Sequence, residues 1–283
     1  MERELTLATL ALSACGSALL VAGSLVPAAG PARRSGCELE HVSASRVWQP
    51  LVLAAFVFAV LLGWGLQEPD ITSEALSPVL QGAALAVAAI WIRAAARAAF
   101  SLVVAGRRRA DAAHTVGLLR PRVVIGPQLA SRLDALELRA VVAHEQAHVH
   151  HRDPLRILMA QLVTDLQWPM PAARGRLQAW RRALELARDE EARACGVEGV
   201  DLASAIVKAA RQSRPGPAAT PALVDGLQLV DRVGRLLGPT PPSRERASSF
   251  RPPVLLAVSL SVAVILGQVW GESVVLALGG VQR

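Results

Sequence analysis

The chain has no tyrosine, a single lysine (Lys208) and only three cysteines among its 283 residues. Cys15, Cys37 and Cys195 are scattered along the sequence, without the paired spacing of a cysteine metal site or a disulfide framework. Arginine therefore carries almost all of the positive charge, and the sequence pI is about 10.9. Much of this arginine flanks long apolar runs, which favours contact with a lipid bilayer and argues against direct binding of nucleic acid.

Long apolar runs dominate the composition instead. Apolar residues make up 52% of the sequence, and the mean hydropathy is +0.37. Four runs of about 15–25 residues come close to or exceed the roughly 20 residues that cross a hydrocarbon core about 30 Å thick, so we expect about four transmembrane helices. The first run lacks a basic segment before it, which favours a membrane helix over a signal peptide. The runs are 5–29, 47–66, 78–92 and 252–270.

The charges between these runs predict their orientation. The first connection contains three arginines, whereas the second, 67–77, contains three acidic residues and no basic one. The third connection begins with three consecutive arginines, 107–109. The positive-inside rule therefore places the long segment after the third run in the cytoplasm. A further apolar stretch, 155–170, contains Arg156 and Asp165, and we expect a buried or interfacial helix there rather than a span.

The sequence His144-Glu145-Gln-Ala-His148 is an HExxH motif within a run of helix-forming residues. Residues four apart on a helix are neighbours, so the imidazoles of His144 and His148 can bind one zinc ion. Zinc lowers the pKa of a bound water to about 7, and Glu145 is placed to accept its proton. The flanking residues are apolar and Asp153-Pro154 ends the helix, which favours a buried zinc site over an exposed surface helix.

The third ligand is expected on the next helical segment, 177–194. Glu185 and Asp189 are four residues apart, and such an acidic pair is stabilised by a nearby cation or imidazole. We interpret Glu185 as the ligand and Asp189 as the group that orients a ligand histidine. The alternative is that this face of the helix is solvated and its acidic residues are balanced by neighbouring arginines. If the face does bind a metal, Glu190 and Glu191 are the other candidate ligands. His151 follows the motif too far along the helix, by about 5 Å, to bind the same ion.

Two further features bear on substrate binding. Val123-Val-Ile125 is a short β-branched stretch before the motif, and it predicts either an edge strand that binds an extended peptide or a structural hairpin. Because tyrosine is absent, any stabiliser of an oxyanion must be arginine, histidine or backbone N–H. Arg188, Arg193 and His150 are equal candidates at this point.

The motifs together resemble a known family. Over residues 117–194 the chain is similar to the BlaR/MecR-type integral-membrane zinc metallopeptidases; the matching segments are 117–125, 136–148, 152–155 and 185–190. The resemblance implies that His144, His148 and Glu185 bind Zn²⁺, that Glu145 is the catalytic base and that Asp189 supports them. It does not extend to the extracellular penicillin-binding sensor of antibiotic-sensing members, because only residues 271–283 follow the last run. We therefore expect a short member without β-lactam recognition.

The expected fold is mainly α, with a gluzincin-like cytoplasmic peptidase domain that contains a short hairpin or edge strand. We expect a membrane region with three helices at 1–105, the peptidase domain at 106–250, and a fourth helix with a short tail at 251–283. Within the domain, 223–237 has the spacing of an amphipathic helix, flanked by linkers rich in proline, glycine and serine.

The leading hypothesis for function is a multi-pass membrane zinc endopeptidase that cleaves a cytoplasmic or membrane-proximal protein. The resemblance implies, as one target, a transcriptional repressor of the BlaI/MecI kind, and hence a role in signalling. A quality-control peptidase of the HtpX or CAAX-protease type shares the same features. The hypothesis from another class is a non-catalytic membrane scaffold, against which the intact Glu145 argues.

Overall fold

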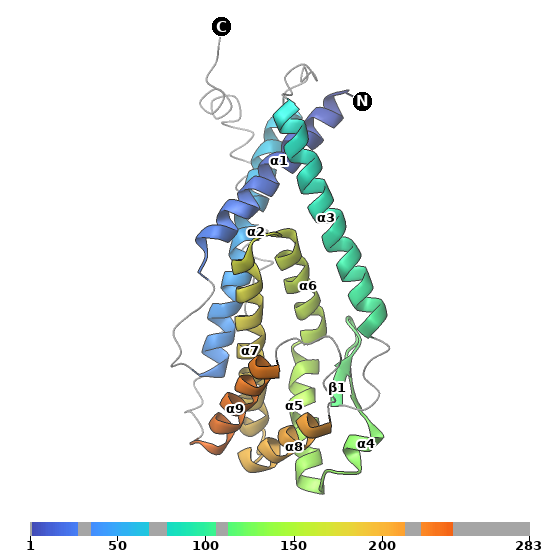
Figure 1. Ribbon diagram of the computed structural model, residues 1–283, viewed down its shortest axis with the longest axis vertical. Helices are drawn as coiled ribbons and strands as arrows, with labels where there is room; N and C mark the ends of the chain where they lie inside the picture. Colours follow the sequence, from blue (N-terminus) through green and yellow to red (C-terminus); the bar gives the residue numbers. More distant parts are fainter. Residues whose placement is uncertain (1, 28–34, 68–77, 106–112, 213–221, 240–283) are drawn as a thin grey trace.

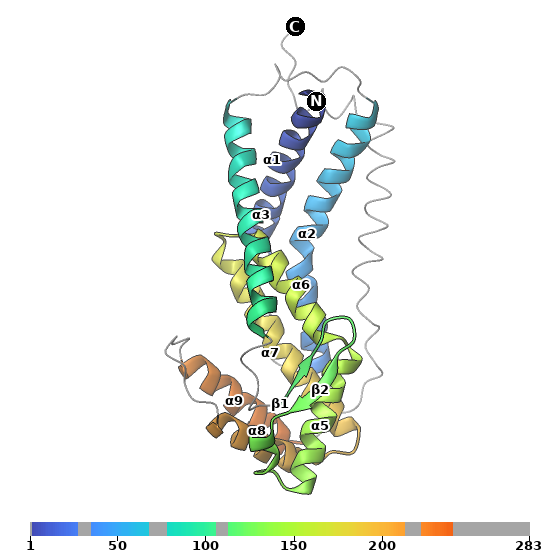
Figure 2. The same cartoon turned by 90° about the vertical axis from the view of Figure 1, so that its right-hand side faces the viewer.

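The computed structural model describes residues 2–27, 35–67, 78–105, 113–212 and 222–239, and it is built mainly of helices. Three long helices stand side by side and extend away from a smaller, more compact assembly of helices and one hairpin (Figure 1, Figure 2). The long helices are α1 (Glu2–Leu25), α2 (Gly36–Gln67) and α3 (Pro78–Ala105). The remaining elements are β1 (Ala113–Val116), β2 (Arg122–Ile125), α4 (Pro127–Ala130), α5 (Ala135–His150), α6 (Asp153–Leu166), α7 (Pro171–Ala194), α8 (Gly199–Gln212) and α9 (Ala222–Leu237).

The expectation of a mainly helical membrane protein is confirmed. Within the described residues, three helices are long and apolar enough to cross a membrane, over Leu5–Leu25, Gly36–Leu61 and Gln81–Val103. Their exposed leucine, valine and phenylalanine side chains suit a lipid environment. The fourth apolar run, 252–270, lies outside the described residues, as do most of the expected linkers.

The helix pair α6 and α7 joins the long helices to the compact part. α6 lies against α2 and α3, and α7 runs along α2, as expected for the 155–170 stretch. Ala44 and Val47 of α2 pack with Ala160, Trp180 and Leu184 in one buried cluster. This apolar contact fixes the membrane helix α2 against α6 and α7, the two helices that follow the HExxH segment.

A glycine permits the closest approach of α2 to α7. A Cβ atom added at Gly36 would lie 2.6 Å from the carbonyl carbon of Leu186 and 2.7 Å from the nitrogen of Ala187. At the same point Glu190 accepts a hydrogen bond of 2.6 Å from the Gly36 N–H. The first turn of α2 is therefore held directly on the backbone of α7.

Helix α5, which contains the HExxH motif, begins at a capping box. The Asp134 carboxylate accepts from the N–H groups of Leu136 and Glu137, and the Glu137 carboxylate accepts from the Asp134 N–H. The same buried Glu137 accepts 2.6 Å hydrogen bonds from Ser204 and Lys208 of α8. Burial raises the pKa of Glu137, but these donors outweigh it and lower the pKa to about 2. The start of α5 is thus fastened to α8.

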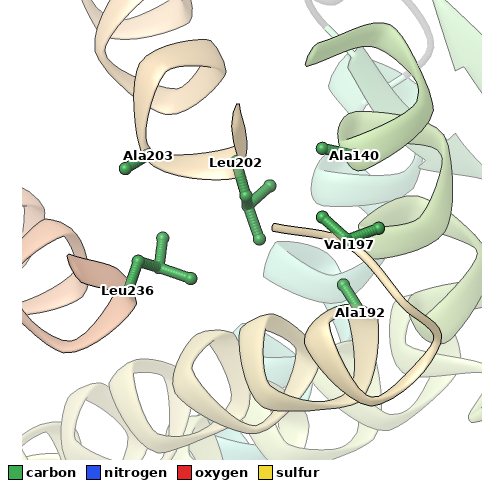
Figure 3. Packing of buried hydrophobic residues seen from close by; sticks show 6 residues of the cluster. All are labelled: Ala140, Ala192, Val197, Leu202, Ala203 and Leu236. Atoms are coloured by element: carbon green, nitrogen blue, oxygen red, sulfur yellow. The ribbon is translucent and has the colours of Figure 1, made fainter. Parts of the chain in front are cut away.

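The short β-branched stretch does form a strand. β2 pairs with β1 as an antiparallel hairpin, in which Thr115 lies opposite Val123. Side chains of α5, α7, α8 and α9, together with one from the α7–α8 connection, form a second apolar cluster (Figure 3). Its buried members are Ala140, Ala192, Val197, Leu202, Ala203 and Leu236. This cluster places α9 beside α7, where α7 passes the HExxH motif.

Candidate metal centre

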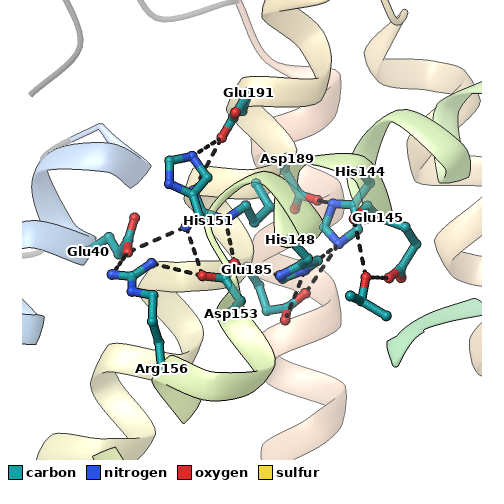
Figure 4. A network of polar contacts seen from close by, with 12 residues as sticks. Glu40, His144, Glu145, His148, His151, Asp153, Arg156, Glu185, Asp189 and Glu191 are labelled. Atoms are coloured by element: carbon teal, nitrogen blue, oxygen red, sulfur yellow. Dashed lines mark hydrogen bonds and ion pairs between the residues drawn. The ribbon is translucent and has the colours of Figure 1, made fainter. Parts of the chain in front are cut away.

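The HExxH motif occupies the buried face of α5. His144 and His148, one turn apart, are 7% and 8% exposed, and their Nε2 atoms are 3.1 Å apart. The two rings meet edge to face, with centroids 4.8 Å apart (Figure 4). The helical spacing therefore brings two imidazole nitrogens to one point, as the sequence predicts.

Glu185 of α7 completes a group of three at that point. Its carboxylate oxygens lie 3.5 Å from Nε2 of His144 and 3.8 Å from Nε2 of His148. One potential ligand atom from each of the three residues lies within 4.8 Å of the others. The other carboxylates considered from sequence point elsewhere: Glu190 caps α2, and Glu191 lies 2.9 Å from Nε2 of His151.

An aspartate contacts each histidine at Nδ1, whereas Nε2 is the ring nitrogen that faces Glu185. Nδ1 of His144 lies 3.0 Å from the carboxylate of Asp189, and Nδ1 of His148 lies 2.8 Å from that of Asp153. Asp189 is the group that the sequence predicts for this role. Asp153 was expected only to end the helix. It reaches His148 because Arg152 adopts φ 53° and ψ 42°, a left-handed turn that starts α6 immediately after α5.

These contacts fit a bound metal cation. A histidine that donates Nδ1–H to a carboxylate presents Nε2 as an acceptor, which is the form that binds metals. The Nε2 atoms of His144 and His148 lie 3.1 Å apart with the Glu185 carboxylate beside them, which is a set of donor atoms that could hold a metal cation. Burial lowers the pKa of His144, but the contacts with Asp189 and Glu185 outweigh it and raise the pKa to about 9. The pocket thus favours positive charge.

Glu145 lies beside this group without belonging to it. Its side chain is buried, and its carboxylate accepts a 2.8 Å hydrogen bond from the hydroxyl of Thr115 on β1. Thr115 also lies 3.2 Å from the backbone carbonyl oxygen of Glu145. The hairpin therefore orients the carboxylate that was predicted to be the base. Sequence reasoning missed Thr115, since it is 30 residues away and no local pattern connects the two.

Arg232 of α9 is the other residue that sequence reasoning missed. Its guanidinium binds both oxygens of Asp189 at 2.8 Å and lies 3.0 Å from Glu185. The only feature of the sequence that points to Arg232 is its position in the amphipathic segment 223–237. The arginines considered from sequence are held elsewhere: Arg188 binds Asp153, and Arg193 binds backbone carbonyls near the end of α9.

The site combines two histidines, four residues apart on a buried helix, with a carboxylate from a second helix and an adjacent glutamate. This is the donor set of a metallopeptidase. Here the set is attached to helices that can span a membrane. The chain matches the family model described as BlaR1 peptidase M56 over residues 75–233. This match covers more than half of the 283 residues, and the chain belongs to that family. No curated protein and no solved structure matches it.

Proposed function

We propose that the chain is a membrane-bound zinc endopeptidase, with zinc held by His144, His148 and Glu185. The observation that carries this proposal is the convergence of these three side chains, from two helices, next to a buried glutamate that is not among them. Three protein ligands and one free position are the usual arrangement of a catalytic zinc site, and imidazole and carboxylate ligands suit zinc.

Zinc in such a site supplies Lewis-acid chemistry, which makes water acidic near neutral pH and polarises a peptide carbonyl. The residues of the chain have distinct roles around it. Asp189 and Asp153 hold the two imidazoles in the metal-binding tautomer. Glu145, oriented by Thr115, accepts a proton from the attacking water and delivers it to the departing amine.

Arg232 places a permanent positive charge at the same point. Two of its five N–H groups have no partner among the contacts with Asp189 and Glu185, and they remain for a substrate oxygen. With tyrosine absent, this guanidinium is the group that we assign to oxyanion stabilisation. The β1–β2 hairpin runs beside Glu145, and we assign to it the binding of an extended substrate segment by strand addition.

The substrate that we propose is a cytoplasmic or membrane-proximal protein, and a repressor of the BlaI/MecI kind is the specific candidate. Two observations support this proposal. Membership of the family implies a repressor as the target, and the site is attached to the ends of the long apolar helices.

A comparison of proteins in cells that express the native chain or Glu145→Ala tests this function. We expect one or a few proteins to accumulate uncut in the Glu145→Ala cells, because the binding site remains while proton transfer is lost. Accumulation of a transcriptional repressor would support the signalling role. Accumulation of many damaged membrane proteins would favour quality control, and identical proteomes would contradict a peptidase function in those cells.

We also propose that the peptidase site faces the cytoplasm, on the evidence of the arginines in the first and third connections. A reporter fused after Arg109 is expected on the cytoplasmic side, and one fused after Glu68 on the opposite side. A cysteine placed at Arg108 should resist a membrane-impermeant thiol reagent in intact cells. Labelling at that position would reverse the assigned orientation.

A further inference from the structure

Asp153, which holds His148, is the centre of a buried ionic network. It is 1% exposed and accepts hydrogen bonds from Arg188 Nε at 2.6 Å and from Arg156 Nη1 at 2.8 Å, in addition to its contact with His148. A buried carboxylate with three such partners has a fixed position. The orientation of the His148 ring therefore depends on whether the two arginines stay in place.

The same two arginines are bound by a residue of the membrane helix α2. Glu40 accepts a 2.5 Å hydrogen bond from Arg156 Nη2 and lies 3.6 Å from Arg188 Nη2. Glu40 enters the network from α2, while His148 lies at its far end beside the metal centre (Figure 4). Its side chain is 12% exposed, so its charge is little screened by water.

The charges in this network balance in a specific way. Arg156 and Arg188 face Asp153 and Glu40, and Arg188 has a further contact of 3.2 Å with Glu191, whose side chain is more exposed than that of Glu40. Without the charge of Glu40, Arg156 has Asp153 as its remaining carboxylate partner among its ion pairs. Both guanidinium groups then draw Asp153 away from His148 and add positive charge beside a cation site, which opposes metal binding.

We propose that Glu40 of α2 is a positioning residue for His148, acting through Arg156, Arg188 and Asp153 to set the affinity of the metal site. Glu40 lies two helical turns before the uncharged stretch 47–66 of α2, about 10 Å along its axis. A helix that is long and apolar enough to span the bilayer thus contributes directly to the orientation of a candidate metal ligand. The proposal rests on the metal site proposed above.

The test is a zinc competition titration of the purified full chain in detergent, with Glu40→Gln as the variant. Loss of a group that orients a metal-binding histidine lowers metal affinity by about 10–100-fold. Glu40 acts one contact further away, so we expect a loss of about tenfold. The absorption spectrum of the cobalt-substituted variant should also change, which a purely structural role for Glu40 would not cause.

Two further variants make the result specific. Glu190→Gln removes a negative charge from the same α2–α7 contact while retaining an acceptor for the Gly36 N–H, and it should bind zinc as the native chain does. The double variant Glu40→Gln/Arg156→Gln restores the charge balance and should recover most of the affinity, even if Glu40→Gln alone folds poorly.

Native affinity and an unchanged cobalt spectrum in Glu40→Gln would overturn the proposal while leaving the metal site intact. An equal loss in Glu190→Gln, or no recovery in the double variant, would also overturn it, since the effect would then not come from the Glu40 charge. A native chain that binds no zinc would instead contradict the proposed function itself.

Discussion

Glu145→Gln is expected to abolish cleavage while leaving the fold and the zinc content unchanged. Glu145 is not one of the three converging side chains, and its carboxylate hydrogen-bonds to Thr115. Glutamine keeps the shape and can still accept the Thr115 hydrogen bond, but it cannot accept a proton. Loss of a general base typically lowers the rate about 10²–10⁴-fold.

The measurement is cleavage of a protein that accumulates in Glu145→Ala cells, with zinc content determined on the same sample. Gln146→Ala is the matched control, because Gln146 is the exposed neighbour on the same helix, and it should cleave normally. A Glu145→Gln protein that cleaves at nearly the native rate with full zinc would reject the assignment of Glu145 as the base.

The second large effect is expected from the proposed ligands themselves. His148→Ala should lose zinc, because only two of the three proposed ligands would remain, fewer than a catalytic zinc site uses. Loss of a group that only orients a metal ligand lowers metal affinity about 10–100-fold. Glu185→Gln changes a proposed ligand, so it should weaken zinc binding at least as much. A competition titration with a chromogenic chelator measures both.

Glu190→Gln provides the control for the carboxylate. Glu190 lies on the same helix as Glu185 and carries the same charge, but it binds the first turn of α2. Normal zinc binding by Glu190→Gln beside weak binding by Glu185→Gln is the expected pattern. The opposite pattern would show that the wrong carboxylate has been assigned.

Much of this site could be predicted from sequence because its geometry is local. The four-residue spacing of a helix determines that His144 and His148 meet, and the same spacing links Glu185 with Asp189. The start of α5 is equally local, since Asp134 and Glu137 form a capping box within one turn. The long apolar helices follow from the length of the uncharged runs.

The remaining groups could not be predicted, because their contacts cross long sequence separations. Thr115 meets Glu145 across 30 residues, and Arg232 meets Asp189 across 43. Glu40 meets Arg156 across 116 residues. Each of the three belongs to a segment whose own pattern indicates only a strand or a helix. Their roles arise from the packing of β1, α9 and α2 around α5 and α7, which depends on tertiary contacts that no single segment encodes.

X-ray absorption at the zinc edge of the full chain tests the central claim most directly. Zinc held by His144, His148 and Glu185 should show two imidazole nitrogens at about 2.0–2.1 Å, carboxylate or water oxygen at about 2.0–2.2 Å, and no sulfur. A sulfur ligand at about 2.3 Å, or a spectrum of fully hydrated zinc, would contradict this assignment of the site.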